Sequence, residues 1–395
     1  MDKKSKIIGL GFLVLVIIAA AAVVFYARGF KLDSTGNLTR TGLLVIDSTP
    51  DGAQVFLDER LTSAADTTIT FLTPKTYHLK LTKEGYTTWE KDVEIKADLT
   101  TEVNAVLFPS IPELKPLTFT GVESPVLSNN GEKLVYGVSS GEKAGLWVIG
   151  MEERALSFNR APTPQQLVKD TSSLKFSNGL ASWSPDDKTI LVTLQENEKD
   201  GEQFTRNYLL EEGKLNTSLR DSTGSLPATL ASWQQEVNLK EDAKVKRLPK
   251  ELAGIASKSA TLILKNEASI SGKLNPYPAN LIWSPDEFKF FIEEKDKIIV
   301  HKFKDPNPLI KTPDQFELPK AQKVFWYPDS EHLVLVEKDK IDIVEVEGTN
   351  RVTIYSGSFE NSNVYVWPNG SKLVILTTFN QGSGSLPNLY AINLQ

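Results

Sequence analysis

The sequence contains no cysteine among its 395 residues. This absence excludes disulfide bonds, thiolate metal sites, cysteine catalysis and lipid attachment to an N-terminal cysteine. Histidine is scarce as well, and His78, His301 and His332 form no His-x-x-x-His or His-Glu pair. We therefore expect no zinc site, no other metal and no cofactor. Packing alone must stabilise the folded domains.

A marked excess of charge is also missing. The 44 basic and 50 acidic residues leave a net charge of −6, and basic clusters such as 244–250 are short and interrupted. Nucleic-acid binding needs a continuous basic face, so we do not predict it. The chain has 40% hydrophobic and 9% aromatic residues, which suffices for the cores of two or three domains.

One long apolar run stands near the N-terminus, from Ile7 to Tyr26. As a helix it would extend about 30 Å, the thickness of a bilayer hydrocarbon core. Lysines precede the run, and fewer basic residues follow it, which favours a cytoplasmic N-terminus. The prediction is a cytoplasmic tail at 1–6, a transmembrane helix at 7–26 and C-terminal domains outside the cytoplasm.

A cleaved signal peptide is the competing interpretation of this run. The alanines at 19–22 could suit a peptidase, but the apolar residues 23–26 prolong the run beyond a usual signal core. We therefore expect the segment to be retained as a single-pass anchor in the cell membrane.

A linker at 27–41, rich in Gly, Ser, Thr and charge, precedes a region of short strands. Six β-branched or alternating runs predict a small antiparallel β-sandwich over residues 42–108. The runs are 43–46, 53–57, 67–71, 77–81, 93–95 and 101–107.

The corner Pro50-Asp51-Gly52-Ala53 lies between the first two of these runs. Pro50 presets φ, Asp51 can bond nearby backbone and Gly52 tolerates positive φ. The region resembles the PEGA domain, a small β module of bacterial surface proteins named for this turn, although Asp51 replaces the Glu of the motif and Glu59 stands where a Gly often occurs. The resemblance implies a surface or binding unit without known catalysis.

A proline-rich linker at 109–116 separates this module from a series of repeated turns. Each turn follows an apolar strand, and neighbouring copies stand about 40 residues apart, the length of one four-stranded propeller blade. The copies are Trp183-Ser184-Pro185-Asp186, Trp283-Ser284-Pro285-Asp286, Trp326-Tyr327-Pro328-Asp329 and Trp367-Pro368-Asn369-Gly370, with an eroded copy at Pro125–Gly131.

These turns resemble the TolB-type, WD-repeat-like propeller repeat, which implies a β-propeller over residues 117–395. We predict six blades, with five or seven as alternatives. Trp233 falls midway between Trp183 and Trp283 and could mark a degenerate blade, whereas 249–257 looks helical. Ring closure should pair 117–120 with the final blade, because closure removes free sheet edges.

The fold class is therefore all-β after the N-terminal helix, and no residue set identifies a reaction. Asp186, Asp286 and Asp329 follow prolines where carboxylates cap turns, and the tryptophans are expected to pack between blades. The serines at 382–385 lack the strand-turn-helix setting of a hydrolase nucleophile. The charged run 196–202 is expected to be a solvated loop. We predict no catalytic, cofactor or metal residues.

These observations predict a membrane-anchored, non-catalytic bacterial envelope protein that binds another protein or a cell-wall glycan through its propeller loops. An accessory subunit of an envelope transport or secretion assembly is the main alternative. An envelope hydrolase or lyase would need a pair of acids within reach of one substrate, and the spacing assigns no such pair. The sequence does not fix the oligomeric state.

Overall fold

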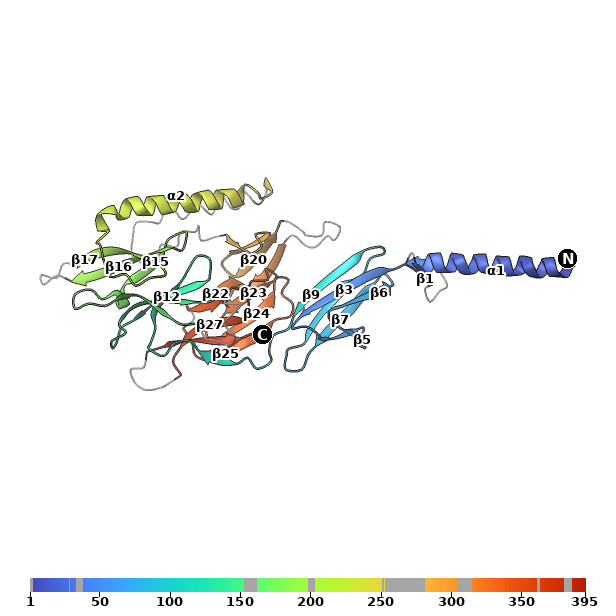
Figure 1. Ribbon diagram of the computed structural model, residues 1–395, viewed down its shortest axis with the longest axis horizontal. Coiled ribbons are helices and arrows are strands. Elements are labelled where there is room, and N and C mark those ends of the chain that lie inside the picture. Colours follow the sequence, from blue (N-terminus) through green and yellow to red (C-terminus); the bar gives the residue numbers. More distant parts are fainter. Residues whose placement is uncertain are drawn as a thin grey trace. The chain divides into compact units, whose positions relative to one another are not determined.

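The computed structural model describes residues 3–27, 29–32, 38–152, 162–197, 203–250, 252, 281–303, 315–360, 363–379 and 386–395. The chain forms two compact units, Met1–Ile111 and Pro112–Gln395. Nearly all regular structure after the first helix is β-strand (Figure 1). The predicted all-β class is therefore confirmed for the described residues.

Helix α1 (Lys3–Ala27) contains the whole predicted apolar run. Its side chains from Leu10 to Tyr26 are all exposed. Across the described part of the chain, however, no helix meets the length and hydropathy needed to cross a membrane. The helix is confirmed, and its passage through a bilayer stays a prediction.

The predicted linker at 27–41 contains regular structure. Strands β1 (Phe30–Leu32) and β2 (Leu38–Arg40) form an antiparallel two-stranded sheet. The Thr41 N–H donates to the Gly29 carbonyl at 3.0 Å, which connects the end of α1 to the start of the next strand. This short strand pair was not predicted, because the segment is rich in turn-forming residues.

Seven further strands of the first unit form two sheets, with the strand orders β6-β3-β9 and β5-β4-β7-β8. The strands are β3 (Gly42–Thr49), β4 (Gln54–Leu57), β5 (Arg60–Ala64), β6 (Thr67–Leu72), β7 (Thr76–Thr82), β8 (Trp89–Glu94) and β9 (Thr100–Val106). Alternate residues of β3 and β7 are buried, and they form one core with Trp89 and Leu107.

Two details of this sandwich differ from the sequence prediction. Strand β5 was not expected, because its side chains are almost all exposed and so give no alternating pattern. Strands β3 and β9 pair in parallel, with Leu43 opposite Thr100, so the sandwich is not wholly antiparallel. Parallel partners lie far apart in sequence, and the local pattern does not reveal them.

The second unit contains five blade-like sheets within its described residues. Blade 1 holds β11 (Glu123–Leu127), β12 (Lys133–Val138), β13 (Gly145–Gly150) and β14 (Gln165–Lys169); blade 2 holds β15 (Leu180–Trp183), β16 (Thr189–Asn197) and β17 (Gln203–Glu211). Blade 3 holds β18 (Ile282–Trp283), β19 (Lys289–Glu293), β20 (Lys297–Lys302) and β21 (Gln315–Pro319). Blade 4 holds β22 (Lys323–Trp326), β23 (His332–Val336), β24 (Lys340–Glu345) and β25 (Val352–Ser356).

Blade 5 joins the two ends of the unit. It consists of β26 (Val364–Val366), β27 (Lys372–Thr377) and β28 (Asn388–Asn393), with β10 (Leu114–Pro116) paired antiparallel to β28. As predicted, the final blade closes the ring. The closing strand is β10, however, and not 117–120, so it lies inside the predicted linker at 109–116. Leu117 extends the pairing by donating its N–H to the Leu389 carbonyl at 2.8 Å.

Helix α2 (Leu226–Val245) follows blade 2. Trp233 lies within this helix, so the expectation that it marks a blade is wrong. Of the helix predicted at 249–257, residue 249 is described and is not helical, residues 250 and 252 are described and are helical, and the others lie outside the described residues. Two short 3-10 helices complete the elements, η1 (Phe176–Asn178) and η2 (Thr223–Ser225). A sixth blade is not among the described strands.

Candidate binding sites

The corner Pro50-Asp51-Gly52-Ala53 leads from β3 into β4. Gly52 has a φ of +75°, in the left-handed region that favours glycine. The Ser48 hydroxyl donates to the Pro50 carbonyl at 2.8 Å, and the Lys83 ammonium donates to the Asp51 carbonyl at 2.5 Å. The corner is therefore held mainly through its backbone, while the Asp51 side chain is exposed.

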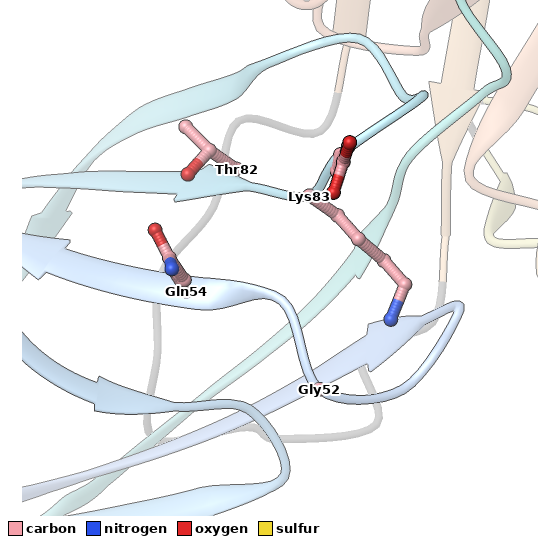
Figure 2. Close-up of a pocket in the computed structure, with 5 residues that line it drawn as sticks. Gly52, Gln54, Thr82 and Lys83 are labelled. Atoms are coloured by element: carbon pink, nitrogen blue, oxygen red, sulfur yellow. The ribbon is translucent and has the colours of Figure 1, made fainter.

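A shallow hollow of about 410 Å³ lies beside this corner, lined by Gly52, Gln54, Thr82, Lys83 and Glu84. Gln54 and Thr82 are paired in register on β4 and β7, and Figure 2 shows Lys83 extending toward Gly52. Its amide, hydroxyl, ammonium and carboxylate groups can hydrogen-bond a small polar ligand. Sequence reasoning missed this hollow because cross-strand pairing creates it.

An exposed charged cluster surrounds His78 on β7. Its Nδ1 lies 2.9 Å from an Asp92 carboxylate oxygen, and its Nε2 lies 3.8 Å from Glu90 and 4.0 Å from Glu59. The hydrogen bond with Asp92 raises the pKa of His78 above its ordinary value. Among the described residues, no group of three or more His, Asp or Glu side chains could hold a metal ion.

The five turns between the first and second strands of the blades share one backbone pattern. The N–H of the first turn residue donates to the carbonyl five residues later at 2.8–2.9 Å, and its carbonyl accepts the N–H three residues later. The first turn residues are Ser128, Ser184, Ser284, Tyr327 and Trp367. Trp367 therefore stands one position later than the other repeat tryptophans, and Val366 takes their place in blade 5.

The Asp or Asn at the third position of each turn completes this pattern. In every copy its side-chain oxygen accepts the N–H two residues later, at 2.8–3.2 Å. The five residues are Asn130, Asp186, Asp286, Asp329 and Asn369. A hydrogen bond from the Ser184 hydroxyl at 2.6 Å lowers the pKa of Asp186. These contacts occupy one side-chain oxygen of each residue within its own turn.

Among the described acids of the second unit, Asp342 on β24 is the most buried, and its carboxylate is also fully engaged. Arg351 donates to it at 2.8 and 2.6 Å, Lys340 at 2.9 Å and Thr353 at 2.8 Å. Burial raises the pKa of Asp342, but the hydrogen bonds from Lys340, Thr353 and Arg351 outweigh burial and hold the pKa below its ordinary value. This carboxylate stabilises blade 4 and presents no free oxygen for chemistry.

Two of the repeat tryptophans, Trp183 and Trp326, connect their blades to the blade before them. The Trp183 indole N–H donates to the Val126 carbonyl of blade 1 at 3.1 Å, and the Trp326 N–H donates to the Ile282 carbonyl of blade 3 at 2.8 Å. Both rings are buried. The rings therefore lie in the interior and are not platforms for stacking a ligand.

Trp283 makes the same kind of bond to a different element. Its N–H donates at 3.1 Å to the carboxylate of Glu241, which lies on α2. Trp367 is buried too, and its N–H has no hydrogen-bond partner in the described parts of the chain.

Helix α2 bridges blades 2 and 3. Lys240 donates to the Pro185 carbonyl in the turn of blade 2 at 3.1 Å, and Arg247, just beyond the helix, pairs with Glu287 in the turn of blade 3 at 2.5 Å. Val245 and Leu248 pack with Trp283 and Phe290. The helix thus takes the position that a preceding blade would have beside blade 3. These contacts were not predicted from the sequence, because they depend on a helix that was not predicted.

Other residues singled out from the sequence do not assemble into a site. The serines at 382–385 and residues 198–202 of the charged run lie outside the described residues, whereas residues 196 and 197 of that run end strand β16 and are not in a loop. His332 is buried beside Asp329, with 2.6 Å between Nδ1 and the carboxylate, and His301 is buried against Phe290. The three histidines belong to three separate sheets.

The two-sheet module with its Gly52 corner defines the class of the first unit. Residues 41–111 match the PEGA domain family, which confirms the resemblance predicted for this module. The match covers a minor part of the chain, so the family assignment applies to this domain. A search of curated proteins found no match for the sequence.

Solved structures similar to the chain include propeller proteins. TolB from Acinetobacter baumannii is 12% identical, with a TM-score of 0.22, and the match covers 81% of this chain and 60% of TolB. A putative TolB from Agrobacterium tumefaciens is 14% identical, with a TM-score of 0.20, and the match covers 68% and 79%. The soluble aldose sugar dehydrogenase of Escherichia coli, in its apo-form, is 10% identical, with a TM-score of 0.28, and the match covers 72% and 100%.

This chain thus spans 60% of the length of the first TolB structure. TM-scores this low support no conclusion about activity or ligand. The blade assignment depends instead on the strand pairing of this chain and on its repeated turns.

Proposed function

We propose that the protein is a non-catalytic component of the bacterial cell envelope, held by α1 and presenting the PEGA domain and the propeller outside the cytoplasm. The observation that carries this proposal is the order of the parts. An apolar helix with exposed side chains stands directly before a domain that matches the PEGA family. A helix that is apolar on every face is poorly suited to water, which supports a membrane location.

The propeller is proposed to bind another protein, and a cell-wall glycan is the second candidate ligand. Loops held on a rigid set of sheets form a broad platform, which suits recognition of a large partner. The polar hollow beside Gly52 is the observation that favours a glycan, because hydroxyl-rich ligands need hydrogen-bonding groups. An accessory role in a transport or secretion assembly is one form of the protein-binding proposal.

The engagement of three turn acids and of Asp342 supports a non-catalytic role. Asp186, Asp286 and Asp329 bond within their turns, and Asp342 is held by Arg351 and its neighbours. A hydrolase or lyase would need carboxylates free to reach a substrate. An enzyme of that class is therefore the weaker proposal.

Protease digestion of intact cells tests location and orientation together. If the proposal holds, the protease removes the PEGA domain and the propeller and leaves a membrane-bound fragment that contains 7–26. Survival of the intact chain until the cells are lysed would contradict the outside location. An N-terminus starting near Val23 would show that the segment is cleaved and the protein released.

Crosslinking in membranes, followed by mass spectrometry, then tests the ligand. A recurrent crosslinked protein would support protein binding, and a stable stoichiometric partner would support an assembly subunit. Retention on purified wall material without any crosslinked protein would favour the glycan. Failure of both assays would contradict a binding role for the propeller.

A further inference from the structure

The end of α1 and the edge of the PEGA domain share a group of aromatic rings. Phe25 contacts Phe30 edge to face, with 5.4 Å between ring centroids, and Tyr26 stacks on Phe71 at 4.7 Å. Phe25 is 46% exposed and Tyr26 is 62% exposed. We call Phe25, Tyr26, Phe30 and Phe71 the aromatic collar. Large rings left this exposed beside a folded domain indicate a contact surface.

A β-bulge directs Phe71 toward this collar. The pairing of β3 with β6 shifts register between Gly42–Leu72 and Leu44–Ile69, so one extra residue lies in β6. Ile69 and Leu72 both pack on the sandwich core, and Phe71 between them has a φ of 60°. A bulge of this kind turns a side chain away from its regular face. The ring of Phe71 therefore meets Tyr26.

The collar is tied to the domain by the backbone as well as by its rings. The Gly29 N–H donates to the Tyr26 carbonyl at 3.0 Å, and the Thr41 hydroxyl donates to the Gly29 carbonyl at 2.7 Å. Arg40 lies over the Phe30 ring at 5.3 Å and also pairs with Asp98 at 2.7 Å. Its charge is thus partly satisfied within the domain, so the surface is chiefly aromatic.

We propose that the aromatic collar seats the edge of the PEGA domain in the interfacial layer of a phospholipid bilayer. This inference rests on the proposed membrane anchor and names the surface on which the domain lies. The collar is continuous with the exposed apolar side chains of α1, which run from Leu10 to Tyr26. Tyrosine and similar rings prefer the level of the headgroups, because one end is apolar and the other polar.

The experiment uses the full chain, and the absence of cysteine makes it simple. A single cysteine replaces the exposed Lys31 beside Phe30, and a matched one replaces Asp51 at the corner where β3 ends. Each protein is labelled with an environment-sensitive fluorophore and reconstituted into vesicles of equimolar phosphatidylcholine and phosphatidylglycerol that contain a nitroxide-labelled lipid. Flotation of the vesicles reports membrane attachment, and quenching reports depth.

If the collar lies in the bilayer interface, the fluorescence emission of the label at position 31 should be blue-shifted. This label should also be quenched several-fold more strongly than the label at position 51. Combined Tyr26→Ser and Phe71→Ser substitutions should reduce this quenching several-fold while the protein still floats. Phe119→Ser is the control, because Phe119 is 80% exposed and lies in the second unit. It should leave quenching unchanged.

Failure of the collar and failure of the anchor give different results. Floating vesicles with both labels equally exposed to water would overturn the collar and leave the anchor intact. Protein that does not float would overturn the anchor and the collar with it. Blue-shifted label without lipid quenching would show that a second copy, and not lipid, covers the collar.

Discussion

Two junctions in the second unit make the same kind of hydrogen bond with different acceptors. One lies between blades 1 and 2, and the other lies between α2 and blade 3. In both, a repeat tryptophan donates its indole N–H to the preceding element. Trp183 donates to the backbone carbonyl of Val126, whereas Trp283 donates to the carboxylate of Glu241. A repeated turn therefore needs an acceptor at one place in space, and either a strand or a helix can supply it.

The turn residues that face the preceding element show the same exchange. Asp187 accepts N–H groups of Asn129 and Asn130, at 2.8–2.9 Å, from the turn of blade 1. The equivalent Glu287 instead pairs with Arg247 and Lys244. A helix has few free backbone N–H groups along its side, so side-chain cations take over. The irregular junction thus depends on charge where the regular one depends on backbone.

The largest expected effect concerns the two tryptophans. Trp183→Ala removes a ring that is 4% exposed and should lower the free energy of unfolding by about 3–5 kcal/mol. Trp283→Ala should cost less, because its ring is only partly buried against α2. Urea unfolding of both variants measures the difference.

Trp183→Phe and Trp283→Phe serve as controls, because they keep an aromatic ring and remove the indole N–H. Each should fall between the wild type and its alanine variant. Equal losses for the two alanine variants would contradict the view that α2 packs less tightly than a blade.

A smaller effect is expected at Glu241. Glu241→Leu leaves the Trp283 N–H without its acceptor, and an unsatisfied buried donor costs about 1–3 kcal/mol in unfolding free energy. Glu241→Gln keeps an acceptor oxygen and should cost clearly less. If Gln and Leu destabilise the protein equally in thermal unfolding, the charge contact with Lys244 at 3.7 Å matters more than the indole bond.

The elements that could be predicted are those whose residues follow a local pattern of alternating burial or of turn residues. Strand β3 alternates buried and partly exposed residues, and Pro-Asp pairs mark the blade turns, so both were predicted. Helix α2 was missed because its inward positions include Glu241 and Lys244, which interrupt the apolar periodicity. The aromatic collar was missed because a bulge, not a sequence period, directs Phe71. The hollow beside Gly52 needs β4 and β7 side by side.

A still smaller effect is expected at acid pH, where the turn with Asp186 should differ from the turns that carry asparagine at the same position. Blades 1 and 5 use Asn130 and Asn369 where blade 2 uses Asp186, and all three accept the same backbone N–H. Asp186→Asn should therefore leave stability at neutral pH almost unchanged. The Ser184 hydroxyl can still donate to the amide oxygen of the new residue, because Ser128 already bonds Asn130 in this way in blade 1 at 2.7 Å.

The pH dependence of stability should distinguish aspartate from asparagine at position 186. Hydrogen bonding from Ser184 lowers the pKa of Asp186 in the folded protein, so its contribution to stability is present above the unfolded pKa of about 3.9. That contribution is lost as pH falls through the lower, folded pKa. Asp186→Asn should lose less stability than wild type when thermal unfolding is followed from pH 5 downward. Parallel curves for the two proteins would show that the charge of Asp186 adds nothing beyond the turn geometry that asparagine already provides in blades 1 and 5.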